Sequence, residues 1–183
     1  YTCTLNNISD NTFWNNGLVL ADNPGGTSLF VFDLSFYNHT VENNLVNGDP
    51  LRYYKNNNTG VVLDDDATGQ IILVNCSNFE IRNMDLNKSI NVPFHLVSSD
   101  NINISNCNVS SNVNGYGIYS VYTNHSNISS SNISFNADGI HLKYSHGNNI
   151  TGSNRIFNNT NGISLLNNSN NNKITDAEIY NNT

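Results

Sequence analysis

The stretch GIHLKYSHGNNITGSNRI, residues 139–156, holds the pattern that decides the fold. Apolar Ile140 and Leu142 flank one polar residue, Ile150 follows ten residues after Ile140, and Ile156 lies six residues further on. Around these anchors apolar and polar residues alternate, which is typical of a β-strand with one buried face. Between them lie Gly, Asn and Ser, which favour tight turns. The stretch therefore predicts three short strands joined by corners.

The same pattern recurs along the chain at steps of 22 to 24 residues. The first anchors of the repeats are Ile71, Phe94, Ile118, Ile140 and Ile163. The second anchors are Ile81, Ile104, Ile128, Ile150 and Ile174, and the third are Leu86, Val109, Ile133, Ile156 and Ile179. A β-sandwich would instead show hairpin spacing of about 8–12 residues without a longer period. Three strands per roughly 23 residues predict an all-β solenoid, a parallel β-helix with coils about 4.8 Å apart.

The repeats place residues 1–183 in a single β-helix domain. We expect regular coils over 71–183 and irregular coils over 1–70, with insertions near 22–36 and 50–66. Within the regular part, the Asn- and Gly-rich segments 136–139 and 159–162 are expected to form tight corners between strands.

Composition limits the function. The chain has 41 Asn, and only 7 Lys and Arg against 14 Asp and Glu, which gives a net charge of −7. Nucleic-acid binding needs clustered Lys and Arg, so no nucleic-acid partner is expected. No apolar run approaches about 18 residues, so no membrane span is expected either. The chain is too rich in aromatic and β-branched residues for disorder. We therefore expect Asn at coil corners and in side-chain ladders, such as Asn83 beside Asn106.

Two segments carry a resemblance to a known family: residues 47–55 (NGDPLRYYK) and 69–76 (GQIILVNC). They resemble the NosD-like right-handed β-helix proteins, part of a wider group named for carbohydrate-binding proteins and sugar hydrolases. The repeat at 139–151 is similar to the consensus coil of that family, and the resemblance covers most of 41–183. It implies a right-handed β-helix of the kind found in archaeal cell-surface proteins, and hence a secreted, extracellular location. It implies no single activity, because the family includes lyases, epimerases, adhesins and structural proteins.

Catalysis on such a fold needs carboxylates together with Arg or Lys on one exposed face. The one acidic cluster is Asp64, Asp65 and Asp66. A solvated turn is the simpler interpretation of this run, and a calcium site is the alternative; no other cofactor is expected. From Ile71 onward the stacked positions show no set of Asp, Arg and Lys, so the sequence favours a protein without catalytic activity.

One column of outward positions contains aromatic residues and histidines. The residues that follow the first anchors are Ile72, His95, Tyr119, His141 and Ser164. His95 and His141 lie two coils apart, about 9.6 Å, which is too far for one metal ion with bonds near 2 Å. His95, Tyr119 and His141 are candidates for an aromatic strip that contacts carbohydrate. The alternative is an exposed ladder stabilised only by stacking.

The three cysteines, Cys3, Cys76 and Cys107, are far apart and odd in number, which predicts buried free thiols and no disulfide framework. Asn-x-Ser/Thr motifs number 14, of which roughly 7 are expected by chance from this composition. In a secreted chain the candidate N-glycosylation sites are Asn38, Asn57, Asn75, Asn87, Asn124, Asn158 and Asn167.

The sequence favours an extracellular structural or interaction protein at a cell surface. Residues 179–183 repeat residues 156–160, and neither end of the sequence shows a capping helix or a charged guard strand. Open sheet edges predict either a longer parent β-helix or end-to-end self-association into a filament or sheath. The alternative function is a carbohydrate-binding module or a polysaccharide lyase-like enzyme acting on surface or acidic polysaccharide.

Overall fold

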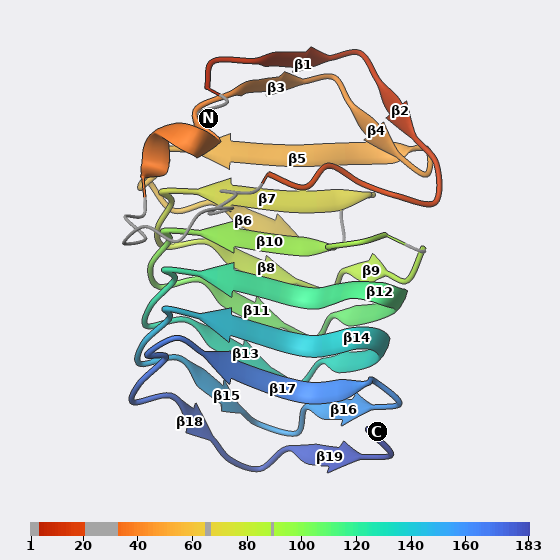
Figure 1. The fold of residues 1–183 in the computed structure, drawn as a ribbon, viewed down its shortest axis with the longest axis vertical. Helices are drawn as coiled ribbons and strands as arrows, with labels where there is room; N and C mark the ends of the chain where they lie inside the picture. Colours follow the sequence, from red (N-terminus) through yellow and green to blue (C-terminus); the bar gives the residue numbers. More distant parts are fainter. Residues whose placement is uncertain (1–3, 21–32, 65–66, 89) are drawn as a thin grey trace, which may run out of the picture.

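The chain forms a β-solenoid of about five turns of roughly 23 residues. The computed structural model describes residues 4–20, 33–64, 67–88 and 90–183. The strands stack in parallel coils along one axis, with the described N-terminal strands at one end and the C-terminal strands at the other (Figure 1). The predicted parallel β-helix is confirmed. Among the described residues, no helix has the length and apolar character needed to cross a lipid bilayer.

Each turn contributes strands to three walls, which we call PB1, PB2 and PB3. PB1 contains β5 (Asp49–Lys55), β7 (Gln70–Val74), β10 (Phe94–Val97), the second parts of β12 (Asn108–Val121) and β14 (Asn132–Lys143), and β17 (Asn161–Leu166). PB2 contains β6 (Val62–Asp64), β8 (Glu80–Arg82), β11 (Asn103–Ser105), β13 (Asn127–Ser129), β15 (Asn149–Thr151) and β18 (Lys173–Ile174). PB3 contains β9 (Asp85–Leu86), the first parts of β12 and β14, β16 (Arg155–Phe157) and β19 (Glu178–Tyr180).

The apolar anchors stack inside the coils in register. Ile71 pairs with Phe94, and Phe94 pairs in turn with Ile118. Ile81, Ile104 and Ile128 form the equivalent column in PB2. These side chains form the main core and are almost completely shielded from solvent. The alternation in the sequence therefore predicted the inward face correctly.

The corner between PB3 and PB1 differs from the expectation. β14 runs without interruption through residues 136–139, where the sequence predicted a separate tight corner. In the next turn the strands do break near the predicted corner at 159–162, since β16 ends at Phe157 and β17 begins at Asn161. The left-handed residue is instead Phe135 (φ 57), and Asn158 (φ 55) and Asn181 (φ 53) occupy the same position in the next two turns. The strand bends there and continues, and Asn136 Nδ2 donates to Asn159 Oδ1 of the next turn at 2.9 Å.

Polar side chains at the corners point inward and join neighbouring turns. The Asn159 side-chain oxygen accepts from the Asn136 backbone N–H at 3.0 Å, and its Nδ2 donates to the Ile133 carbonyl at 3.1 Å. Asn182 repeats both bonds toward Asn159 and Ile156. These bonds satisfy backbone groups that are buried where the strands bend.

The cysteines belong to the same system of corners. Cys107 Sγ donates to the Ser105 carbonyl at 3.2 Å, as Ser131 Oγ one turn later donates to the Ser129 carbonyl at 2.8 Å. Cys76 and Cys107 are buried free thiols as predicted, and burial raises the pKa of Cys107 to about 11. A thiol with such a pKa stays protonated and unreactive. Cys3 lies outside the described residues.

Predicted amide ladders are present on the surface as well. Asn106 Nδ2 donates to Asn83 Oδ1 at 2.6 Å, so the expected pair is confirmed. Asn101 donates to Asn78 in the same way at 2.7 Å. Asn83 and Asn106 have φ of 59 and 53, which places them in the left-handed turn conformation that Asn tolerates.

The N-terminal residues do not continue the regular stack. β1 (Asn7–Ser9) pairs in parallel with β3 (Thr40–Glu42), and β2 (Thr12–Phe13) pairs with β4 (Leu45–Val46). β4 then pairs antiparallel with β5, so the chain reverses direction at that point. This reversal sets the N-terminal strands β1 to β4 apart from the regular coils.

The two expected insertions have different outcomes. Residues 21–32 lie outside the described residues, and the rest of the first expected insertion forms η1 (Leu34–Tyr37), a 3-10 helix. The second, at 50–66, is wrong for the described residues: β5 and β6 are regular strands in register with β7 and β8. The turn is shorter than the others, because Arg52 pairs with Ile71 only 19 positions later (71 − 52).

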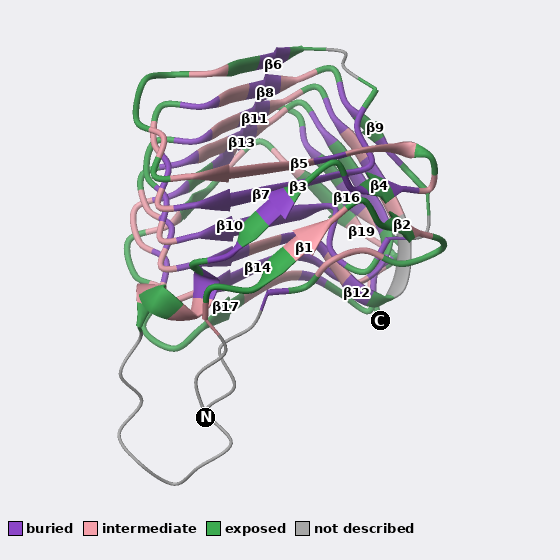
Figure 2. Cartoon of the chain, turned by 90° about the horizontal axis from the view of Figure 1, so that it is seen from above, coloured by how far each residue is buried: buried purple, intermediate pink, exposed green. Residues whose placement is uncertain are grey.

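A second apolar cluster covers the outer face of PB1. Ile72, Val74, Val97 and Val121 point outward from this wall and pack with N-terminal residues such as Tyr37. PB1 therefore carries buried residues on both faces, which Figure 2 shows as continuous purple strands in β7 and β10. The sequence of a parallel strand that is buried on both faces is a continuous apolar run, and Ile71–Val74 is such a run.

Candidate functional site

The column of His95, Tyr119 and His141 lies on the outer face of PB1, as predicted. β10, β12 and β14 place these residues in direct register. The His95 and Tyr119 rings lie 5.2 Å apart between centroids, and the Tyr119 and His141 rings are also 5.2 Å apart. The expected stacking is therefore present.

The expected exposure of this column is wrong for its two histidines, whereas Tyr119 is half-buried. His95 is 0% exposed and His141 is 7% exposed. The sequence treated the outer face of PB1 as solvated, but the second apolar cluster covers part of it, and the Tyr37 ring stands edge-on to His95 at 6.4 Å. His95 cannot contact a carbohydrate in this structure.

His95 is buried without hydrogen bonds. Neither ring nitrogen has a partner among the described residues. Burial lowers the pKa of His95 to about 4, because the charged ring would lose its hydration. The imidazole is therefore neutral at physiological pH, and it serves as a flat ring in the stack.

His141 has a different environment, which includes a carboxylate. Its Nδ1 lies 2.6 Å from Asp138 Oδ2, and Asn161 Nδ2 donates to Asp138 Oδ1 at 2.7 Å. Burial of Asp138 acts to raise its pKa, but hydrogen bonds from His141, Asn161 and Ser164 outweigh burial and hold the pKa below its usual value. Asp138 is therefore ionised, and it orients the His141 ring with Nδ1 as the donor.

Two tyrosines complete this cluster. The Tyr116 and Tyr119 rings are stacked at 4.9 Å, and the Tyr116 ring lies 4.5 Å from the His141 ring. Sequence reasoning missed Tyr116 and Asp138. No local sequence pattern pointed to them, because Tyr116 and Asp138 come together only as register partners at the PB3–PB1 bend. The cluster thus joins a histidine oriented by a carboxylate to two tyrosine rings.

The two ends of the solenoid form a second candidate site. The core positions of the last turn are exposed: Ile174 by 39% and Ile179 by 46%, whereas Ile150 and Ile156 one turn earlier are 0% exposed. Most of the exposed large apolar side chains in the described residues lie in the last turn or in the N-terminal segment. At the C-terminal end these are Leu165, Leu166, Ile174 and Ile179, and in the N-terminal segment they are Leu5, Trp14, Val19 and Leu45.

Strand edges are open at the same places. β18 pairs only with β15, and β19 pairs only with β16, within the described residues. β1 and β2 likewise pair on one side each, with β3 and β4. Apolar side chains beside strand-edge N–H and C=O groups that lack a strand partner favour pairing with a further strand.

A family model described as "Right handed beta helix region" matches residues 69–183. The match covers more than half of the 183 residues. The chain belongs to the right-handed β-helix family. No curated protein and no solved structure matches it.

The family match begins at residue 69, directly before β7. The residues before it include the reversed N-terminal strands and η1. The β-helix that the family describes is therefore the regular stack from β7 to β19.

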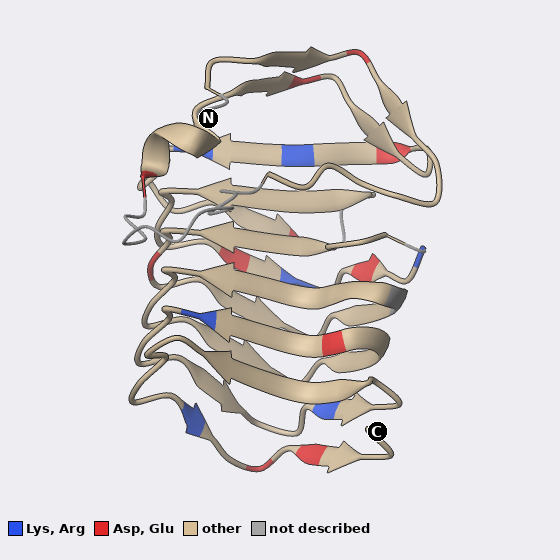
Figure 3. Cartoon of the chain, viewed as in Figure 1, with Lys and Arg blue, Asp and Glu red and all other residues tan. Residues whose placement is uncertain are grey.

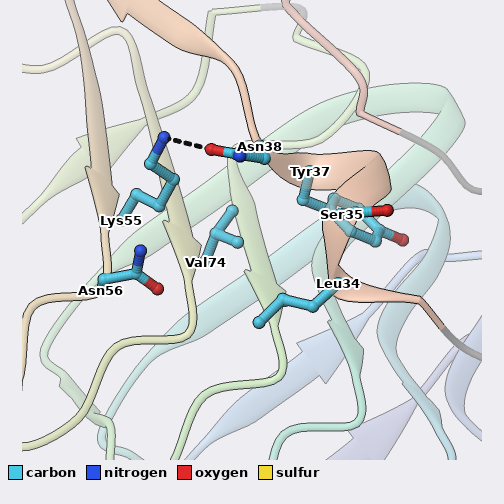
Figure 4. Close-up of a pocket in the computed structure, with 7 residues that line it drawn as sticks. All are labelled: Leu34, Ser35, Tyr37, Asn38, Lys55, Asn56 and Val74. Atoms are coloured by element: carbon cyan, nitrogen blue, oxygen red, sulfur yellow. Dashed lines mark hydrogen bonds between the residues drawn. The ribbon is translucent and has the colours of Figure 1, made fainter. Parts of the chain in front are cut away.

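A cavity of about 190 Å³ lies where η1 meets the outer face of the β-helix (Figure 4). Its lining includes apolar Leu34, Tyr37 and Val74. Lys55 Nζ donates to Asn38 Oδ1 at 2.6 Å and to the His39 carbonyl at 3.2 Å. The lysine thus holds the N-terminal segment against PB1.

The candidate calcium site keeps only one described member. Asp64 accepts from Arg82 Nε at 2.8 Å and from Asn83 Nδ2 at 2.5 Å, and Asp65 and Asp66 lie outside the described residues. The hydrogen bonds from Asn83 and Arg82 hold the pKa of Asp64 below its usual value. No group of three His, Cys, Asp or Glu side chains in the described part of the β-helix is placed to hold a metal ion.

Charged residues are scattered over the β-helix (Figure 3). Several form local pairs, such as Arg82 with Glu80 and Arg155 with Glu178. Arg155 also lies over the Phe157 and Tyr180 rings, at 5.5 and 6.0 Å from their centroids. Apart from these pairs, the flanks of the described β-helix present mainly side-chain amides, hydroxyls and aromatic rings.

The candidate N-glycosylation sites all lie at the surface of the β-helix. Asn38, Asn87, Asn158 and Asn167 are exposed, and Asn57, Asn75 and Asn124 are half-buried. Asn57 Oδ1 accepts from both the backbone N–H and the hydroxyl of Thr59, at 3.1 and 2.9 Å. These two bonds close a turn around the motif.

Proposed function

We propose that this protein is an extracellular structural β-helix that joins end to end with copies of itself into a filament or sheath, and that it has no catalytic activity. Within the right-handed β-helix family we place it with the NosD-like proteins of cell surfaces. One observation carries the proposal: the apolar core positions of the last turn are exposed and lie beside open strand edges.

The free energy gained by burying the exposed apolar side chains indicates how strong this association should be. Covering the exposed parts of Leu165, Ile174 and Ile179 contributes on the order of 3 kcal/mol. This gain is smaller than the free-energy cost of the translational and rotational freedom that is lost on association. Backbone pairing along the open edges must therefore add to it. We expect association that strengthens clearly with protein concentration.

The surface composition supports a location outside the cell. Candidate glycosylation motifs lie on the exposed sides, and charged residues are few. A surface of amides and hydroxyls suits close packing of rods without strong charge repulsion.

The test is sedimentation velocity of the purified chain over a range of concentrations, with electron microscopy of the concentrated samples. We expect a shift to larger species with concentration, and elongated particles that lengthen along the solenoid axis. Ile174→Lys with Ile179→Lys should abolish the shift, because two charges would then lie on the apolar end. The matched control is Phe135→Lys, since Phe135 is exposed on the flank. A chain that stays monomeric at every concentration would overturn the proposal.

The second candidate function is carbohydrate binding. It is favoured by the stacked Tyr116 and Tyr119 rings next to the Asp138–His141 pair. Aromatic rings pack against the apolar faces of sugar rings, and the half-buried Tyr116 and Tyr119 rings are partly open to solvent. Isothermal titration with neutral and acidic polysaccharides tests this function.

Tyr116→Ala should remove binding of any such polysaccharide. Tyr144→Ala should leave it intact, because Tyr144 stacks with Tyr122 in a separate pair. A lyase-like activity would release unsaturated products that depend on His141. Absence of binding to every polysaccharide, or equal loss in both variants, counts against this second function.

A further inference from the structure

The two ends of the solenoid have the same local backbone shape. Ile8 and Phe13 are five residues apart at the N-terminal end, and Ile174 and Ile179 are five residues apart at the C-terminal end. Left-handed residues occur at equivalent places between and after these anchors. They are Asp10 (φ 58) and Asn15 (φ 53) in the first segment, and Asp176 (φ 56) and Asn181 (φ 53) in the second. β1–β2 and β18–β19 are therefore two copies of one strand–corner–strand unit.

We propose that the β18–β19 edge of one copy pairs in parallel with the β1–β2 edge of a second copy, with Ile174 opposite Ile8 and Ile179 opposite Phe13. This inference rests on the proposed end-to-end association and specifies its surfaces and its register. The two edges lie at opposite ends of the molecule (Figure 1). Each addition therefore leaves a free edge for the next copy, so growth does not close on itself.

The contacts of this interface already exist within the chain. β1 pairs with β3 so that Ile8 lies opposite Val41, and β2 pairs with β4 so that Phe13 lies opposite Val46. β15 pairs with β18 so that Ile150 lies opposite Ile174. The proposed pairing repeats this geometry between molecules, at the usual strand spacing of about 4.8 Å.

Aromatic side chains match in the same register. The Phe157 and Tyr180 rings are stacked at 5.2 Å with an interplanar angle of 5°. Tyr180 directly follows Ile179, and Trp14 directly follows Phe13. Trp14 is 69% exposed, which is unusual for so large an apolar side chain. In the proposed register the Trp14 ring of the second copy continues the stack beyond Tyr180.

The corner hydrogen bonds also match. Within the chain, a corner N–H donates to the side-chain oxygen of the corner residue one turn later: Asn11 to Asn44 at 3.1 Å and Ser131 to Asn154 at 3.0 Å. Ala177 is the next corner residue after Asn154. In the proposed register its N–H meets Asn11 Oδ1 of the second copy, an oxygen with no partner among the described residues.

One pair opposes the association. Asp176 of one copy lies beside Asp10 of the next, and like charges opposite each other in a sheet are unfavourable. Lys173 and Glu178 lie opposite the uncharged Asn7 and Thr12. The register therefore predicts that Asp176→Asn strengthens the association by about two- to fivefold in dissociation constant. The matched control is Asp85→Asn on the flank, which should leave the association unchanged.

Disulfide trapping tests the register directly. Strands at about 4.8 Å bring paired Cα atoms within the range of a disulfide, about 4.4–6.8 Å. In a Cys3→Ser background, Trp14→Cys combined with Tyr180→Cys should give covalent chains of many copies on mild oxidation. Each single variant should give dimers at most. The displaced pair, Thr12→Cys with Tyr180→Cys, should not form chains, since it lies two positions out of register.

The outcomes separate this inference from the proposed function. If the chain associates but the displaced pair cross-links as well as the matched pair, the register is wrong and end-to-end association stands. If it associates and neither pair cross-links, or if Asp176→Asn does not strengthen association, these edges are not the interface. If the unmodified chain stays monomeric, both proposals fail.

Discussion

Single asparagines do two different jobs in this protein. Asn159 is buried, and its amide bonds to backbone groups of the turn before and to Asn182 of the turn after. Asn75, Asn83 and Asn106 instead adopt left-handed turns near the surface. The high Asn content thus follows from the number of corners, because each turn needs short polar side chains that bond to the main chain.

Asn159→Ala should destabilise the protein strongly. It leaves the Asn136 N–H and the Ile133 carbonyl buried without partners, so we expect the free energy of unfolding to fall by about 2–4 kcal/mol. Urea unfolding followed by circular dichroism measures this. Asn149→Ala, on the exposed side of β15, should change it by less than about 0.5 kcal/mol. Similar effects of the two variants would contradict the role of the buried column.

His95 should give the stability a pH dependence. Its pKa falls from 6.5 to about 4 on folding, so the unfolded chain binds a proton between these values that the folded chain does not. Stability should therefore fall as pH decreases from 6.5 to about 4, by about 3 kcal/mol, and this loss should stop below that range. His95→Phe should remove this part of the pH dependence in thermal unfolding.

His125→Gln is the matched control for His95→Phe. His125 is exposed and pairs with Asp100 at the surface, so its loss should leave the dependence between pH 4 and 6.5 largely in place. An unchanged slope in His95→Phe would mean that the ring is hydrated in solution.

At the level of the element, the bend from PB3 to PB1 depends on glycine. A Cβ atom on Gly139 would lie 2.6 Å from the Gly162 carbonyl oxygen, and one on Gly117 would lie 2.6 Å from that of Gly139. No positive φ is involved at these positions; the requirement is the close approach of successive turns. This is why one glycine recurs at this bend in turn after turn.

Gly139→Ala should therefore push two turns apart. We expect a loss of about 1–3 kcal/mol in the free energy of unfolding, because the clash is with backbone that is fixed on both sides. Ala137→Ser, two residues away and half-buried, adds a similar volume and should cost under about 1 kcal/mol. Denaturant titration of both variants measures the two losses in the free energy of unfolding. Equal losses would show that the turns can separate without strain.

Elements differ in how far the sequence predicts them. Columns such as Ile81–Ile104–Ile128 follow from period and alternation, since each inward residue must be apolar. The burial of His95 does not, because it depends on residues about 60 positions earlier, such as Tyr37, packing over PB1. Asp138 and Tyr116 were missed for a similar reason: the bend in β12 and β14 brings them to His141, and no local pattern reports a bend.

At the scale of the molecule, stability is distributed along the axis. Each turn contacts mainly the turns beside it, so the middle of the stack is supported on two sides and the last turn on one. The core positions are accordingly closed in β7 to β16 and open in β18 and β19.

Hydrogen exchange should show this gradient. Amides of β10 to β14 should exchange slowly, and those of β18 and β19 fastest among the regular turns, because the last turn opens without disturbing the rest. If copies associate through this edge, protection in β18 and β19 should increase with protein concentration while the central strands stay unchanged. Uniform exchange rates, or protection independent of concentration, would contradict one or both expectations.

The close repetition of the turns, 22 to 24 residues at each step, has a consequence for how such a protein changes over generations. Duplication of one complete turn, for example residues 94–117, would supply its own core anchors and its own corner residues. It would lengthen the rod by about 4.8 Å. Every other turn would keep the same kind of contacts with its neighbours. Length can therefore change in whole steps by copying and deletion, without any redesign of the cross-section.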